Sequence, residues 1–263
     1  MIKCRILFAV VLSIAFWTGP LFSQETASSP SVAGLALKAG LSGEYFARTL
    51  GWDEDAKAMT STLKTYLALA HVNLQLREGF DIAVLAGYAS SDSGGVLYKN
   101  LPFSIDYEGG GISGYLLGVE ARKSLFTVQD FEISAFAQFV SYTGTEKTWE
   151  IPGLAVTGTV EFAPSWTRLS LGPVVAYKGF LNFTPYLSIQ YNRLAGTFEM
   201  RQTVQTLSGI EKKAVKAKSP VAILLGCAYA LTGQISLIGE AGIMPYKSHL
   251  DSSFMLKAQI SFK

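Results

Sequence analysis

The clearest pattern in the sequence is an alternation of apolar and polar residues that continues to the end of the chain. Between Pro220 and Lys263, apolar side chains stand at every second position of three segments. In the last two segments, the opposite positions carry mostly polar residues. A period of two residues is that of a β-strand, whose successive side chains point to opposite faces. Thr232-Gly233 separates the first two segments as a tight turn. The pattern therefore predicts antiparallel strands with one uncharged face.

The same alternation recurs in the rest of the chain and predicts about ten strands. They cover residues 32–48, 63–76, 80–88, 115–122, 131–139, 166–177, 183–192, 221–229, 235–241 and 254–262. Pro173 and Pro185 lie on apolar rows, where a proline removes one hydrogen-bond donor from the ladder. We therefore expect a bulge or a strand end at each of these prolines.

The predicted connections alternate in length. Those after the first, third, fifth and seventh strands are long, those after the second, sixth and eighth are tight, and 123–130 is intermediate. The connection 143–165 contains two segments that flank Pro152-Gly153, which predicts a hairpin protruding beyond the main sheet. Residues 193–219 are predicted as the longest loop, with room for strand extensions at its base. Ten strands that start and end in the periplasm, with short periplasmic turns and long external loops, reproduce this order.

Composition favours a membrane barrel over a soluble one. The chain is 49% hydrophobic and 16% charged, with a mean hydropathy of +0.28, whereas soluble domains are about 25% charged. After the first two dozen residues, no apolar run approaches the roughly 20 residues of a transmembrane helix. The predicted outward rows carry no Asp, Glu, Lys or Arg, and a lipid-facing basic residue at mid-depth costs about 2–4 kcal/mol. We predict an all-β, transmembrane, antiparallel up-and-down β-barrel; a soluble barrel or sandwich is the alternative.

With this topology, the outward aromatic residues gather at the two ends of the strands, as expected for rings that prefer the headgroup level. The external group contains Tyr45, Tyr66, Tyr88, Tyr115, Phe139, Tyr191 and Phe254. The periplasmic group contains Phe80, Phe131, Tyr177, Phe183, Tyr229 and Phe262.

By these patterns the chain resembles the bacterial outer-membrane β-barrel class, in the manner of the small OmpA-type and ten-stranded barrels. The resemblance implies location in the bacterial outer membrane, contact with outer-membrane lipid and lipopolysaccharide, and insertion by the barrel-assembly machinery. Barrels of this class usually end in an aromatic residue; here Phe262 is penultimate and Lys263 is last.

The first residues have the features of a secretory signal peptide, which we assign to residues 1–23. Lys3 and Arg5 precede the apolar segment 6–17, and Ser23 is a small residue suited to cleavage. Residues 24–31 are then a short periplasmic lead and 32–263 the barrel domain. After cleavage, Cys227 is the only cysteine, so no intramolecular disulfide or cysteine metal site is expected. The net charge of +2 is too small to suggest nucleic-acid binding.

Charged residues on the inward rows are the candidates for function in the lumen. They are Lys38, Glu44, His71, Glu120, Glu132, Arg168, Glu240 and Lys257. A small barrel is nearly filled by its side chains, and charges inside it must pair or be hydrated. One interpretation is a network of ion pairs that fills the lumen; the other is a narrow solute path gated by one pair. We expect opposite charges to pair across the lumen.

The sequence gives little support for catalysis or for a cofactor. It has no nucleophile motif of the type Gly-x-Ser-x-Gly and no phosphate-binding loop. Enzymatic barrels such as the ten-stranded omptin proteases need acidic pairs with a histidine at the mouth. His249 and Asp251 are two residues apart, without a second acidic pair that clearly belongs with them. We predict no catalytic residue, no metal site and no cofactor.

Four lysines cluster in the longest predicted loop: Lys212, Lys213, Lys216 and Lys218. They are either solvated or in contact with lipopolysaccharide phosphates or another acidic partner. The sequence therefore predicts a structural or surface-interaction barrel with a mostly filled, charged lumen. A narrow porin-like channel is the alternative, and a hydrolase at the barrel mouth is a weaker one.

Overall fold

The computed structural model describes residues 36–52, 60–77, 79–151, 157–247 and 249–262. The predicted signal peptide, the lead and the start of the first strand lie outside these ranges, as do Pro152-Gly153 and Lys263. Among the described residues, no helix is long and apolar enough to cross a membrane.

The elements in these ranges are β-strands. They are β1 (Ala36–Trp52), β2 (Thr60–Arg77), β3 (Phe80–Gly94), β4 (Val96–Tyr98), β5 (Ile105–Tyr107), β6 (Ile112–Val128), β7 (Phe131–Gly144), β8 (Lys147–Glu150), β9 (Gly158–Tyr177), β10 (Phe183–Val204), β11 (Leu207–Ala217), β12 (Val221–Ala230), β13 (Ile235–Tyr246) and β14 (His249–Phe262).

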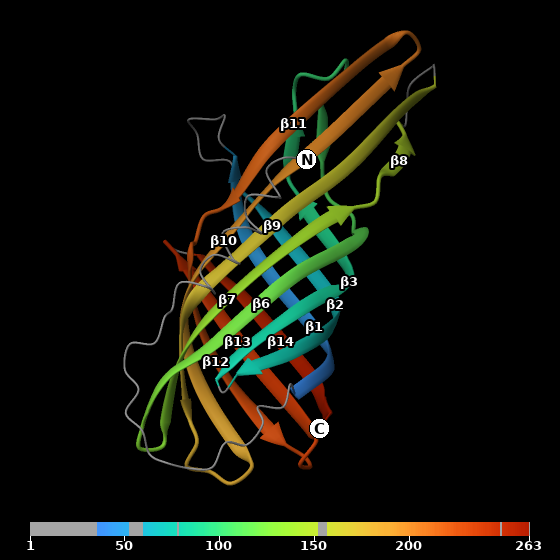
Figure 1. The fold of residues 1–263 in the computed structure, drawn as a ribbon. Coiled ribbons are helices and arrows are strands. Elements are labelled where there is room, and N and C mark those ends of the chain that lie inside the picture. The colour runs from blue at the N-terminus through green and yellow to red at the C-terminus, as the bar shows by residue number, and fades with distance from the viewer. Residues whose placement is uncertain (1–35, 53–59, 78, 152–156, 248, 263) are drawn as a thin grey trace. The chain divides into compact units, whose positions relative to one another are not determined.

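Ten of these strands form a closed antiparallel barrel, which confirms the predicted fold class. The order around the ring is β1-β2-β3-β6-β7-β9-β10-β12-β13-β14 (Figure 1). The ring closes between the first and last strands, from Leu37 opposite Phe262 to Ala47 opposite Ser252. Closure leaves no unpaired edge, which is a requirement for a sheet that crosses a bilayer.

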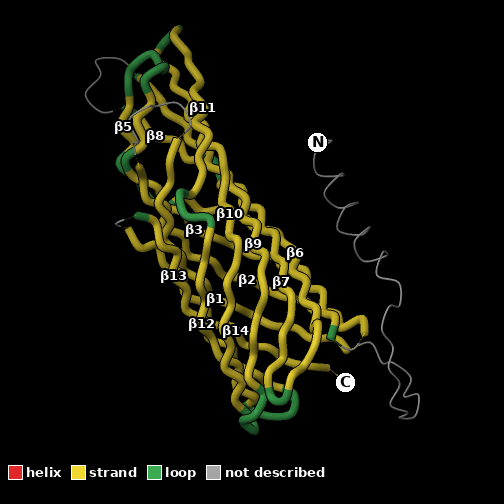
Figure 2. The backbone as a smooth tube through the Cα atoms, turned by 90° about the vertical axis from the view of Figure 1, so that its left-hand side faces the viewer, coloured by secondary structure: helices red, strands yellow, loops and turns green. Residues whose placement is uncertain are grey.

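Three strands continue far beyond the external end of the ring. The first part of β10 pairs with β12, and its last part pairs with β11. β11 then joins β1, with Leu50 opposite Ala217. Figures 1 and 2 show β9, β10 and β11 rising beyond β12, β13 and β14. The barrel wall is therefore taller on one side than on the other.

The prediction that residues 193–219 form a loop was wrong, because most of them belong to β10 and β11. The inward alternation continues through Leu194, Phe198 and Met200, which are buried. The outward row, however, changes from apolar residues to polar ones such as Arg193 and Arg201. The prediction required an uncharged outward row, so it ended the strand at this change. The strand itself continues to Val204.

The predicted connection 123–130 is also shorter in the structure. β6 continues to Val128, and the turn consists of Gln129 and Asp130, with Gln129 at a φ of 53°. A bulge between Ser124 and Phe126 shifts the register, which breaks the alternation on which the prediction relied. The hairpin predicted within 143–165 is present, because β8 pairs with residues 159–162 of β9.

The two prolines on the apolar rows lie where the ladder between β9 and β10 is incomplete. The register of these strands runs through Ser188 opposite Val174 and resumes at Tyr191 opposite Leu171, so Pro173 has no pairing partner on β10. The Ser188 hydroxyl donates to the carbonyl oxygen of Pro173 over 2.7 Å. Pro185 precedes the first residue of β10 that pairs with β9 and is paired only to β12. This agrees with the expected irregularity at both sites.

The outer face of the ring is a belt of exposed apolar side chains. Leu41, Leu117, Leu225 and Leu256 are 65–69% exposed although they lie in the middle of strands. A soluble protein rarely exposes a contiguous apolar surface of this extent, whereas a membrane barrel requires it. This excludes the soluble alternative, and the chain is a transmembrane β-barrel of the outer-membrane type.

The aromatic residues predicted for the two girdles lie on the outer face, mostly near the ends of this belt. Two external pairs are in contact: Tyr45 with Tyr66 at 4.8 Å between ring centroids, and Tyr88 with Tyr115 at 6.2 Å. At the periplasmic end, Phe131 contacts Tyr177 at 5.0 Å. Phe80, Phe183, Tyr191, Tyr229 and Phe262 are also partly or largely exposed. Lys123 is an exposed basic residue close to the periplasmic end of the belt.

Candidate functional site

The external half of the lumen is filled by a hydrophobic core, which we call the outer core. Its buried residues come from the walls and from the β4–β5 hairpin. They are Phe46, Leu50, Leu63, Leu67, Leu69, Ala83, Leu85, Ala89, Val96, Tyr98, Leu101, Tyr107, Ile112, Leu116, Val140, Tyr142, Val160, Phe162, Trp166, Leu194, Phe198, Met200 and Val215.

Trp166 is the largest fully buried side chain of this core. Its ring stacks on Tyr142 at 5.1 Å and meets the edge of Phe46 at 5.5 Å. The indole N–H donates to the hydroxyl of Ser91 over 3.2 Å, so its polar atom is satisfied. Side chains from β9, β7, β1 and β3 therefore converge at one point in the lumen.

The segment between β3 and β6, predicted only as a loop, adds a second layer to the outer core. Its β4–β5 hairpin places Tyr107 against Phe162 at 4.4 Å and Tyr98 against Phe162 at 6.3 Å. The backbone N–H of Asn100 donates to Glu211 Oε2 over 2.7 Å, and that of Phe103 donates to Gln202 Oε1 over 2.7 Å. Burial raises the pKa of Tyr107 to about 12. The hairpin is thus held to the tall side of the wall by both apolar and polar contacts.

On the periplasmic side of the outer core, Arg168 of β9 forms an ion pair across the lumen with Glu44 of β1. One guanidinium nitrogen pairs with Glu44 Oε1, and the other donates to Glu44 Oε2 over 2.9 Å and to Gln138 Oε1 over 3.0 Å. Gln138 in turn donates to Glu120 Oε2 over 3.0 Å. The guanidinium also lies 5.3 Å from the ring centroid of Phe46. The network joins four strands and forms the polar lower surface of the outer core.

A second charge network was missed in the sequence and is centred on Arg48. Its Nη1 donates to Asn192 Oδ1 over 2.6 Å, and its Nε lies 3.4 Å from Asp251 Oδ2. Asp251 also accepts hydrogen bonds from the backbone N–H and hydroxyl of Thr49, at 2.9 and 2.7 Å. Arg48 lies on the inward row of the predicted strand 32–48, and Asp251 lies on the inward row of β14, two steps before Met255. This alternation is the signal that would have identified both residues.

The remaining predicted lumen residues lie nearer the periplasmic end. Glu132 forms ion pairs with Arg122 at 3.8 Å and Lys178 at 3.4 Å. Lys38 occupies an inward, half-buried position and has no ion pair in the part of the chain that the structure describes.

A cavity of about 230 Å³ occupies the inner half of the lumen. Its lining extends from Arg48, next to the outer core, to Lys178 and Thr184, next to a periplasmic turn. Glu240 accepts a hydrogen bond from the Tyr186 hydroxyl over 2.9 Å, and His71 Nε2 lies 2.6 Å from the Ser42 hydroxyl. The lumen thus has a mainly apolar external half and a polar periplasmic half.

The predicted lysine cluster lies mainly on β11 and not in a loop. Lys212 pairs with Glu199 at 2.7 Å, and Lys213 pairs with Glu211 at 2.7 Å. Lys216 lies opposite Gly51 in the ladder with β1, and the side chain of Lys218 covers the same glycine. Ion pairing therefore reduces the positive charge that the cluster presents.

His249 and Asp251 are the residues that the sequence analysis considered for a hydrolase site at the barrel mouth. The side chain of His249 lies outside what the structure describes, and the Asp251 carboxylate is bound to Arg48 and Thr49. Among the described residues, no group of three or more His, Cys, Asp or Glu is arranged to hold a metal ion.

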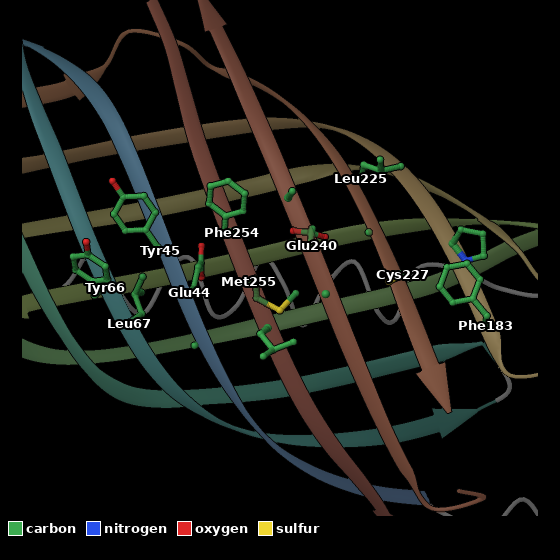
Figure 3. Close-up of a pocket in the computed structure, with 16 residues that line it drawn as sticks. Glu44, Tyr45, Tyr66, Leu67, Phe183, Leu225, Cys227, Glu240, Phe254 and Met255 are labelled. Carbon is green, nitrogen blue, oxygen red and sulfur yellow. The ribbon is translucent and has the colours of Figure 1, made fainter. Parts of the chain in front are cut away.

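The outer wall also contains an open hollow of about 850 Å³ on its lipid-facing side. Figure 3 shows Tyr45, Tyr66, Phe254 and Leu225 on the strands that border it. It forms because the strands on both sides of β14 carry glycine opposite Leu256: a Cβ at Gly43 or at Gly239 would meet no atom within 4 Å. In a bilayer, acyl chains fill such a surface depression.

No family model and no curated protein matches this sequence. Several solved outer-membrane barrels are similar in structure. The outer-membrane protease OmpT from Escherichia coli is 9% identical with a TM-score of 0.47, covering 89% of this chain and 98% of its own. The translocator domain of the autotransporter NalP from Neisseria meningitidis is 11% identical with a TM-score of 0.46, covering 99% and 95%. Ail from Yersinia pestis is 10% identical with a TM-score of 0.32, covering 86% and 98%. Identities of 9–11% and TM-scores of 0.32–0.47 are too low to support an inference about function.

Proposed function

We propose that this outer-membrane barrel is a non-conducting, non-enzymatic protein with a structural or surface-interaction role. The observation that supports this role is the outer core, in which side chains from opposite walls meet at Trp166. Interiors packed in this way leave few voids larger than a water molecule. Hydrated ions would have to displace apolar side chains to pass.

The part of β9, β10 and β11 that continues beyond the ring is the surface on which we expect partners to bind. Strands β9, β10 and β11 form a continuous ladder, and their outward side chains include Glu161, Glu199 and Arg201, which are linked by ion pairs. The outer core supports this ladder from inside, so the surface is rigid. We infer contact with lipopolysaccharide or an external ligand at this surface, and insertion by the barrel-assembly machinery.

A narrow channel is the second candidate, because the inner cavity already provides a polar path through half of the lumen. Single-channel recording in planar bilayers separates the two functions. We expect the folded barrel to insert without producing conductance steps, while a porin inserted under the same conditions conducts. Protease protection and the gel shift of the unheated protein verify insertion. Steady steps from verified, inserted protein would reject the proposed role in favour of the channel.

A further inference from the structure

We propose that the inner cavity binds a small zwitterionic solute, a molecule with an ammonium and a carboxylate group a few bonds apart, as in an α-amino acid. Glu240 would hold the ammonium group and Lys257 the carboxylate. The inference does not rest on the proposed function, because a sealed lumen and a conducting one would both contain this site.

Glu240 and Lys257 face the same cavity from neighbouring strands without pairing to each other. Glu240 lies opposite Met255 and Lys257 lies opposite Ile238, so the two residues are diagonal neighbours on the inward face of β13 and β14. Diagonal neighbours have Cα atoms about 7–8 Å apart. Within the part of the chain that the structure describes, neither residue has an ion pair, and Lys257 has no hydrogen bond. The pair is therefore open to a molecule placed between its charges.

The surroundings of Glu240 favour a positive group. Glu44, Glu120 and Glu240 all lie within electrostatic range of Arg168, and that guanidinium is the cation that these three carboxylates share. Only Glu44 pairs with it directly. One oxygen of Glu240 accepts from Tyr186, and the other has no partner among the described residues. An ammonium group at this oxygen would offset the excess negative charge.

The surroundings of Lys257 favour a negative group. Lys257 is buried and lies within electrostatic range of His71, which is 5% exposed and also lines the cavity. His71 Nε2 contacts the Ser42 hydroxyl, and Nδ1 has no hydrogen-bond partner among the described residues. In the tautomer in which Ser42 donates to Nε2, Nδ1 carries a proton and can donate it to a carboxylate oxygen. A lysine ammonium and an unpartnered N–H thus lie on the same side of the cavity.

The size and access of the cavity suit a small solute. Its volume of about 230 Å³ exceeds the volume on the order of 100 Å³ that six heavy atoms need at protein-like packing. Arg122 and Glu132, near the periplasmic end, are 36% and 22% exposed, so water reaches the cavity from that side.

Calorimetric titration of the folded barrel in detergent with three probes tests the proposal. L-alanine carries both charges, lactate lacks the ammonium group, and isopropylamine lacks the carboxylate. We expect alanine to bind at least about tenfold more tightly than either analogue, since each missing charge removes one charge-assisted contact. Equal binding of alanine and lactate, equal binding of alanine and isopropylamine, or no binding of alanine at about 10 mM would overturn the proposal.

Substitutions then locate the site. Glu240→Gln and Lys257→Met should each weaken alanine binding at least about tenfold. Glu199→Gln and Lys212→Met remove the same charges from the external ladder and should leave alanine binding unchanged. Unchanged binding in the two lumen variants would place the alanine elsewhere and reject the assignment. If these variants fail to fold, the comparison of the three probes on the unmodified barrel still decides.

Discussion

Replacing Arg168 by methionine should lower the free energy of unfolding by about 3–5 kcal/mol, because it leaves the Glu44 carboxylate buried without its partner. Arg168 and Glu44 are 6% and 13% exposed at their side chains, so water compensates little for the lost pair. Urea unfolding of the barrel in lipid vesicles, followed by tryptophan fluorescence, measures the change.

The double variant Arg168→Met with Glu44→Leu should recover much of this loss, because it removes both charges together. Arg201→Met is the matched control: Arg201 is 49% exposed and pairs with Glu161 at 3.4 Å on the external ladder. Its replacement should change the free energy of unfolding by less than about 1 kcal/mol. If Arg168→Met is no more destabilising than Arg201→Met, the lumen pair is hydrated and does not support the fold.

Replacing Trp166 by alanine should also cost about 3–5 kcal/mol, the usual range for removing a buried aromatic side chain. The variant loses the stacking on Tyr142 and the edge contact with Phe46, and it leaves a void between four strands. The same urea titration measures this change, with circular dichroism as the signal because the substitution removes a tryptophan.

Trp166→Phe is the control for this second prediction. It keeps most of the apolar volume and removes the hydrogen bond to Ser91, which is worth about 1 kcal/mol. If Trp166→Ala lowered the free energy of unfolding no more than Trp166→Phe, the external half of the lumen would not be packed. The proposal that the outer core closes the lumen would then be wrong.

The sequence predicts the membrane-spanning ring well, because every strand of the ring needs an uncharged row of side chains toward the lipid. Lipid contact demands an uncharged outward row, and this row is visible at Leu41, Leu117 and Leu256 without knowledge of neighbouring strands. The same rule fails where the environment changes from lipid to water. Beyond Tyr191 the outward row becomes polar at Arg193, so the external half of β10 was not recognised as strand.

The inward rows were predicted less completely than the outward rows. Arg168 and Glu44 were both placed in the lumen, and their contact follows only from the closed ring, since they are 124 residues apart. The outer core was not predicted. Inward apolar residues such as Leu67 and Leu85 look like breaks in a polar row, and their role follows only from the buried cluster that they share with Trp166 of another strand.

We infer that the lumen is closed toward the outside and open toward the periplasm. Cysteine labelling in sealed vesicles tests it, with Cys227 replaced by serine. In barrels whose external end faces outward, Lys212→Cys should react with a membrane-impermeant maleimide, and Gln129→Cys in the periplasmic turn should stay protected. We predict that Glu240→Cys behaves like Gln129→Cys and reacts only after the vesicles are opened. Reaction of Glu240→Cys in intact vesicles, together with Lys212→Cys, would show that the lumen is open toward the outside.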